Sequence, residues 1–136
     1  MNEFKIPRKI LDQMIAQAKA AVPVEACGIL AGTGEMVEKL YEMTNADNSP
    51  VHYTMVPQEQ FKVSKDMRTW SGKMLAIYHS HPATPARLSE EDIKLAFMPG
   101  VAYVILSLAI PDSPDIKAFN VEDGTVISVP VEVVKG

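Results

Sequence analysis

The sequence predicts a single α/β domain in which helices flank a mixed central β-sheet. Helical and strand patterns alternate along the chain, and there is neither an internal repeat nor a low-complexity linker. The chain has 136 residues, 47% of them hydrophobic, which is enough for one core and too little for a second. We therefore expect one domain that spans residues 1–136.

A helix is predicted between Pro7 and Pro23, because apolar residues recur there at intervals of three or four. These residues are Ile10, Leu11, Met14, Ile15 and Ala18. Strands are expected next at residues 26–31, 35–43 and around 52–56.

The alternation continues through the second half of the chain. A helix from residue 57 to about 70 has Val63, Met67 and Trp70 on its apolar side, and a strand follows at 74–81. The segment 102–108 is apolar on both faces, which is typical of a central strand. Two more strands are expected at 116–120 and 125–133, joined by a turn at 122–124.

Two histidines close the strand expected at residues 74–81. Because side chains alternate along a strand, His79 and His81 lie on the same face and can bind one ion together. Neutral imidazole is the commonest protein ligand for zinc, and an Asp oxygen is an accepted third partner. Three protein ligands with a fourth position open to water are typical of a catalytic zinc site. Structural zinc sites usually use several cysteines, and the chain has only one, so a structural site is not expected. Alone, two histidines on a strand can also serve packing.

Asp92 is the candidate third ligand. Residues 89–92 have the Ser-x-x-acid form of a helix start, with Ile93, Ala96 and Phe97 on the apolar side and a stop at Pro99-Gly100. An acid in the first turn is kept ionised by the helix dipole and is ready to coordinate a cation. Without the histidines, the same residues would be interpreted as an ordinary capping box.

Glu25 is a lone acid among small and apolar residues at the mouth of the strand 26–31. A buried carboxylate is costly, so it should be paired or have a raised pKa. Near a metal-bound water molecule, such a carboxylate can shuttle a proton.

Together these positions resemble the JAMM motif of the MPN-plus metallopeptidases: Glu25, His79-Ser80-His81-Pro82, Ser89 and Asp92. The likeness covers roughly residues 5–110. It implies a single-domain JAMM/MPN fold, which is cytidine-deaminase-like, and a zinc metallopeptidase or isopeptidase. It also implies Zn²⁺ held by His79, His81 and Asp92, with Glu25 as general base and acid and Ser89 stabilising the oxyanion. None of these positions departs from the motif.

The resemblance also implies a substrate class. The family includes deubiquitinating enzymes, archaeal enzymes that act on ubiquitin-like modifiers, and small bacterial peptidases that trim the tail of a ubiquitin-like sulfur carrier. The chain is similar to the last group in size and in lacking long insertions. We therefore expect hydrolysis of a peptide or isopeptide bond at the C-terminal tail of a sulfur-carrier protein, with the tail laid along a sheet edge. Three alternatives stay open: deconjugation of a modifier from lysine, a non-catalytic MPN interaction module, and an amidase for small peptides.

Charge and composition limit the classes of partner and the cellular location that we expect. A net charge of −4, a pI near 5.3 and the lack of a basic run argue against nucleic acid and against an anionic membrane surface. No signal peptide or membrane span is recognised, and a single cysteine cannot form an internal disulfide. We expect a cytoplasmic protein. The sequence does not indicate an oligomeric state.

Two other residues invite a functional interpretation, but the simpler structural one is favoured for each. Cys27 follows Glu25 by two positions, yet a small thiol is a common core residue. His52 is expected at the surface or in a groove rather than on the metal, which already has three ligands.

Overall fold

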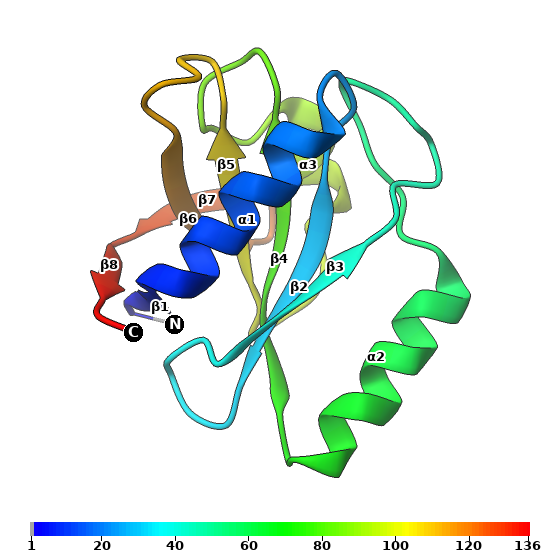
Figure 1. The fold of residues 1–136 in the computed structure, drawn as a ribbon, viewed down its shortest axis with the longest axis vertical. Coiled ribbons are helices and arrows are strands. Elements are labelled where there is room, and N and C mark those ends of the chain that lie inside the picture. Colours follow the sequence, from blue (N-terminus) through cyan, green and yellow to red (C-terminus); the bar gives the residue numbers. More distant parts are fainter. Residues whose placement is uncertain (1) are drawn as a thin grey trace.

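The computed structural model describes residues 2–136 and forms two sheets (Figure 1). The strands of the large sheet have the order β3-β2-β4-β5-β6-β7; β4 and β5 run parallel, and the other neighbours run antiparallel. The elements are β1 Phe4–Pro7, α1 Arg8–Ala21, β2 Cys27–Gly32, β3 Lys39–Met43, α2 Pro57–Thr69, β4 Lys73–His81, α3 Glu90–Leu95, β5 Ala102–Ser107, β6 Asp115–Glu122, β7 Thr125–Val129 and β8 Val131–Val134. The mixed sheet predicted from the sequence is confirmed.

Helix α1 covers one face of the large sheet, crossing over β2, β4 and β5 (Figure 1). The helix predicted between Pro7 and Pro23 is confirmed, and its apolar stripe faces the sheet. Every residue of β5 is buried, which confirms its predicted central position. The largest core cluster includes Ile10, Leu11, Met14 and Ala18 of α1, Leu30 of β2, Ala76 and Tyr78 of β4, and Ala102, Val104 and Leu106 of β5.

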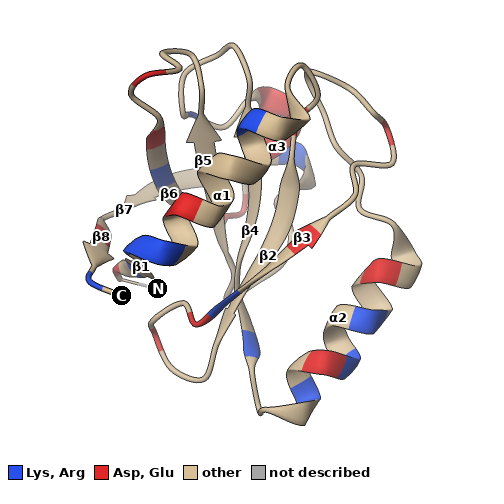
Figure 2. Cartoon of the chain, in the orientation of Figure 1, with Lys and Arg blue, Asp and Glu red and all other residues tan. Residues whose placement is uncertain are grey.

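Helix α2 lies on the opposite face of the large sheet. Its buried residue Val63 belongs to a second core cluster with Cys27 and Ile29 of β2. Because side chains alternate along β4, His79 and His81 are on this face, together with Ile77, while Ser80 points toward α1. Acidic and basic residues are interspersed along α2 (Figure 2). None of the helices described is long and apolar enough to span a membrane.

The strand predicted around residues 52–56 is wrong. The segment between β3 and α2 is a loop closed by one antiparallel bridge, between Asn45 and Met55. The physical reason is a side chain: the Asn45 amide binds the carbonyl of His52 and the N–H of Thr54, two groups that a neighbouring strand would otherwise pair. Strand β3 is also shorter than the predicted range 35–43.

The strand predicted at 125–133 is broken at Pro130, which has no N–H for a ladder. The Pro130 carbonyl instead accepts a hydrogen bond of 2.8 Å from the N–H of Phe4. Strand β8 then leaves the large sheet and pairs in parallel with β1, a strand that the sequence analysis did not predict.

Helix α3 is shorter than the sequence suggested. It ends at Leu95, well before Pro99-Gly100. Ala96 is buried as expected, but Phe97 lies outside the helix and is 79% exposed, so its place on an apolar helix side is wrong.

Candidate metal centre

Three candidate ligand atoms meet at the end of β4. His79 Nε2 and His81 Nε2 are 3.2 Å apart, and each lies 3.3 Å from Asp92 Oδ2. Ligand atoms held tetrahedrally at about 2.0–2.1 Å from a zinc ion are about 3.3–3.4 Å from one another. The observed triangle has this size, so the donor set fits a zinc ion with one position left open.

The two histidine rings are held differently. His81 Nδ1 lies 2.9 Å from the Pro85 carbonyl, a contact that places the proton on Nδ1 and leaves Nε2 as a lone-pair donor. His79 Nδ1 is buried and has no hydrogen-bond partner among residues 2–136. Its ring instead stacks on Tyr53, with ring centroids 4.7 Å apart and an interplanar angle of 26°. On the Nδ1 side, packing therefore orients the His79 ring, whereas a hydrogen bond orients the His81 ring.

Asp92 is held by the N-terminal cap of α3. Ser89 Oγ accepts a hydrogen bond of 3.0 Å from the Asp92 N–H, and the Ser89 N–H donates one of 2.9 Å to Asp92 Oδ2. The capping box and the ligand position thus coexist, because the cap fixes the carboxylate that faces the histidines. Burial raises the pKa of Asp92, but hydrogen bonds from His79 and His81 outweigh it and hold the pKa far below its usual range.

Glu25 lies beside this triangle in a different environment. It is 3% exposed, and its Oε1 has no hydrogen-bond partner in the described part of the chain. A Glu25 carboxylate oxygen and one nitrogen each of His79 and His81 all lie within 4.8 Å of one another. Burial raises the pKa of Glu25 from 4.5 to about 7, although His81 partly opposes this. Of the two carboxylates, Asp92 is suited to bind a cation and Glu25 to hold or release a proton.

The structure gives Ser80 a role that the sequence analysis did not assign, and it adds Tyr53 and Asn45 to the site. Ser80 points away from the histidines, and its Oγ accepts a hydrogen bond of 2.8 Å from the Ala26 N–H, while its own N–H donates to the Ala26 carbonyl at 2.9 Å. These bonds join the end of β4 to the segment that carries Glu25. The position of Ser80 could have been predicted, because side chains alternate along a strand and a serine between two histidines faces the opposite side of the sheet. Tyr53 and Asn45 had no comparable signal.

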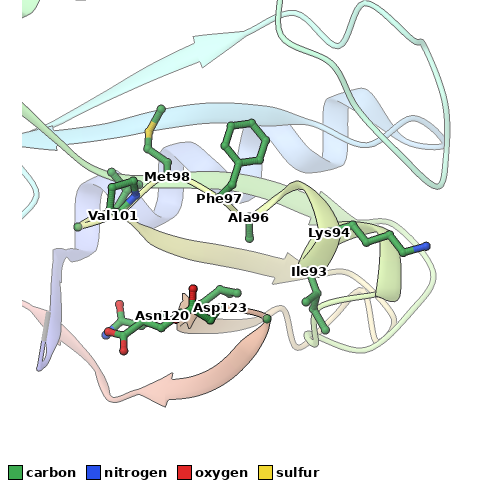
Figure 3. A pocket seen from close by; sticks show the side chains of 13 residues that line it. Ile93, Lys94, Ala96, Phe97, Met98, Val101, Asn120 and Asp123 are labelled. Atoms are coloured by element: carbon green, nitrogen blue, oxygen red, sulfur yellow. The ribbon is translucent and has the colours of Figure 1, made fainter.

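The hollows near the site differ in size and composition. A pocket of about 20 Å³ lies at the candidate ligands and is lined by Tyr53, His79, Leu88, Asp92, Leu95 and Tyr103. A much larger cavity, of about 780 Å³, lies between residues 93–101 and the β6–β7 turn (Figure 3). In that view, Phe97 and Met98 point away from Asn120 and Asp123. The larger cavity is lined by none of Glu25, His79, His81, Ser89 and Asp92, so its size does not locate the chemistry.

Cys27 and His52 match their simpler interpretations. Cys27 is fully buried in the core, and burial raises the pKa of its thiol to about 12. His52 lies in the loop before α2, with Nδ1 at 3.0 Å from Asp47 Oδ2, and it is outside the group of candidate ligands.

Comparisons with known proteins agree with the geometry. Residues 7–122 match the family model of prokaryotic homologs of the JAB domain. A Mycobacterium tuberculosis protein named CysO-cysteine peptidase is 38% identical over 128 residues, which cover 93% of this chain and 88% of that protein. A Thermus thermophilus protein named "Probable TtuB-protein conjugate cleaving protease" is 33% identical over 127 residues, covering 93% and 81%. The solution structure of a Desulfitobacterium hafniense protein has a TM-score of 0.90 and 42% identity, covering 98% and 94%. The chain therefore belongs to the prokaryotic homologs of the JAB domain, as a small protein of the JAMM/MPN family that its motif indicated.

Proposed function

We propose that this protein is a zinc-dependent JAMM metallopeptidase that hydrolyses a peptide or isopeptide bond at the C-terminal tail of a ubiquitin-like sulfur-carrier protein. The observation that carries the proposal is the ligand triangle of His79, His81 and Asp92, with edges of 3.2–3.3 Å and the buried Glu25 beside it. The relative named CysO-cysteine peptidase supports the substrate class.

Each motif residue has a role in this proposal. His79, His81 and Asp92 would hold the ion, and zinc, when bound, supplies a Lewis acid that acidifies water and polarises a carbonyl group. Glu25 takes up a proton from the attacking water at its carboxylate and returns it to the leaving amine. Burial suits Glu25 to this work, because it brings the pKa close to neutral, where the carboxyl both accepts and releases a proton.

Ser89 is proposed to stabilise the oxyanion of the tetrahedral intermediate. Its Oγ is an acceptor in the α3 cap, so the hydroxyl hydrogen is available for donation. A single donor aimed at a developing oxyanion typically contributes about 10²–10³ to turnover. The same side chain would then hold Asp92 and assist the reaction.

Replacement of Glu25 by glutamine tests the mechanism. The variant should keep its zinc, measured by elemental analysis, and lose turnover of CysO-cysteine, measured by mass spectrometry of the carrier. The expected loss is about 10²–10⁴-fold, which is the usual contribution of a general base. Full activity of Glu25→Gln would sink the mechanism.

A second candidate is the release of a ubiquitin-like protein from a lysine side chain. The relative named for cleaving TtuB-protein conjugates supports it, and the same residues would serve both reactions. Parallel assays with a branched lysine conjugate and a linear tail would separate the two. The single domain of residues 1–136 and the cytoplasmic location stay predictions from the sequence.

A further inference from the structure

The loop of residues 45–54 contacts the candidate metal centre. One of its residues, Tyr53, supplies the ring that stacks on His79 at 4.7 Å. His79 Nε2 faces Asp92, but Nδ1 has no hydrogen-bond partner among the described residues, so on that side of the ring its orientation depends on the stacking and on the strand around it. Whatever holds the 45–54 loop therefore also holds a candidate ligand.

The side chain of Asn45 makes several of the hydrogen bonds that hold this loop together. Its Nδ2 donates to the carbonyls of Glu25, at 3.1 Å, and of His52, at 3.0 Å, with a longer bond of 3.5 Å to the carbonyl of Ser49. Its Oδ1 accepts from the N–H groups of Asp47, at 3.0 Å, and of Thr54, at 3.2 Å. An asparagine amide offers two donor hydrogens and two acceptor lone pairs, and all four are used here.

The bond to Glu25 distinguishes Asn45 from an ordinary turn residue. Four of its five bonds stay within the loop, but the fifth reaches a residue 20 positions away that carries the catalytic carboxylate. The Glu25 N–H adds a second tie, a hydrogen bond of 2.9 Å to the carbonyl of Ser49 in the same loop. The side-chain Oε1 of Glu25 has no partner in the described chain, and the two backbone ties fix the point from which this side chain extends.

We propose that Asn45 is a positioning residue, which couples the backbone of Glu25 to the loop that presses Tyr53 on His79. This inference rests on the proposed function and deepens it. The amide places the proton carrier and one metal ligand relative to each other without touching the substrate. Asn45→Asp is the informative variant, because it keeps both acceptor bonds inside the loop and replaces the donor group, including the bond to Glu25, by an oxygen that repels the facing carbonyls.

Asn45→Asp and Asn45→Ala should be compared with Asp47→Ala as the matched control. The Asp47 side chain holds the exposed side of the same loop through His52 and Thr54, while its backbone N–H still serves Asn45. With CysO-cysteine as substrate and zinc at saturation, kcat of both Asn45 variants should fall about tenfold or more, because small misplacements of reacting groups are costly. KM should change less than about twofold, because Asn45 does not contact the substrate. Asp47→Ala should match the wild type.

A second readout uses the metal-free protein and needs no activity. Stacking on Tyr53 shifts the NMR signals of the His79 ring protons, and both Asn45 variants should move them toward unstacked values, while Asp47→Ala should not. The inference is overturned if Asn45→Asp keeps kcat within about twofold of the wild type, or if its His79 signals are unchanged. If Asn45→Ala does not fold, Asn45→Asp decides. If wild type loaded with zinc leaves CysO-cysteine uncut, the proposed function fails, and the His79 signals still test the role of Asn45 in the loop.

Discussion

Replacing Glu25 by glutamine should stabilise the metal-free protein above neutral pH. Burial raises the pKa of Glu25 from 4.5 to about 7, so the native state keeps a proton that the unfolded chain has already released. The native state therefore loses stability as the pH rises from 4.5 to about 7, and the loss is constant above that range. At about 1.4 kcal/mol per pH unit, this difference in pKa corresponds to about 3 kcal/mol. Glutamine carries no charge, so the stability of the Glu25→Gln variant does not fall in this way as the pH rises.

Urea unfolding with a chelator present measures the effect. The quantity to compare is the free energy of unfolding of Glu25→Gln minus that of the wild type. Relative to its value in acid, this difference should grow by less than about 1 kcal/mol at pH 5 and by about 3 kcal/mol at pH 8. Glu42→Gln, a change at an exposed position of β3, is the control and should show no such gain. The same difference in stability at pH 5 and pH 8 would refute the claim that Glu25 is a buried, unpaired carboxyl group.

Wild type purified without added metal should contain about one zinc per chain by elemental analysis, and His79→Ala should contain almost none; equal zinc in both would contradict the site. Ser89→Ala should lower the free energy of unfolding by about 1 kcal/mol and, because the cap fixes Asp92, weaken zinc binding about tenfold in a chelator competition. Unchanged zinc affinity would contradict the claim that the Ser89 cap holds Asp92 for the metal. Burial raises the pKa of Cys27 from 9.0 to about 12, so at pH 8 its thiolate is about a thousandfold rarer than in the unfolded chain. Iodoacetamide should label Cys27 only as fast as the protein unfolds, and rapid labelling of the native state would contradict the burial.

Local periodicity explains which parts of the structure could be predicted. Helix α1 and strand β5 follow simple patterns of burial, and the i, i+2 spacing of His79 and His81 places both rings on one face. The acidic residue Asp92 could be located because its helix start has a local signature. In each case, the information lies within a few neighbouring residues.

The parts that could not be predicted depend on contacts between distant residues. The segment 52–56 has the composition of a strand, but the Asn45 side chain occupies its backbone groups. Strand β1 has four residues and forms because β8 arrives beside it from the other end of the chain. The roles of Tyr53 and Asn45 also require knowledge of which loop lies over the end of β4. No pattern within one segment carries that information.

The candidate metal centre is assembled from segments that are remote in the chain, and this links metal binding to folding. The three candidate ligands lie within residues 79–92, whereas Glu25 is brought beside them by the pairing of β2 with β4, in which Cys27 lies opposite His79. An ion that binds the native state and not the unfolded chain adds about 4 kcal/mol of stability at a free concentration a thousandfold above its Kd. By the same linkage, zinc in the growth medium should partly conceal the stability defects of substitutions deep in the α1 core, far from the site.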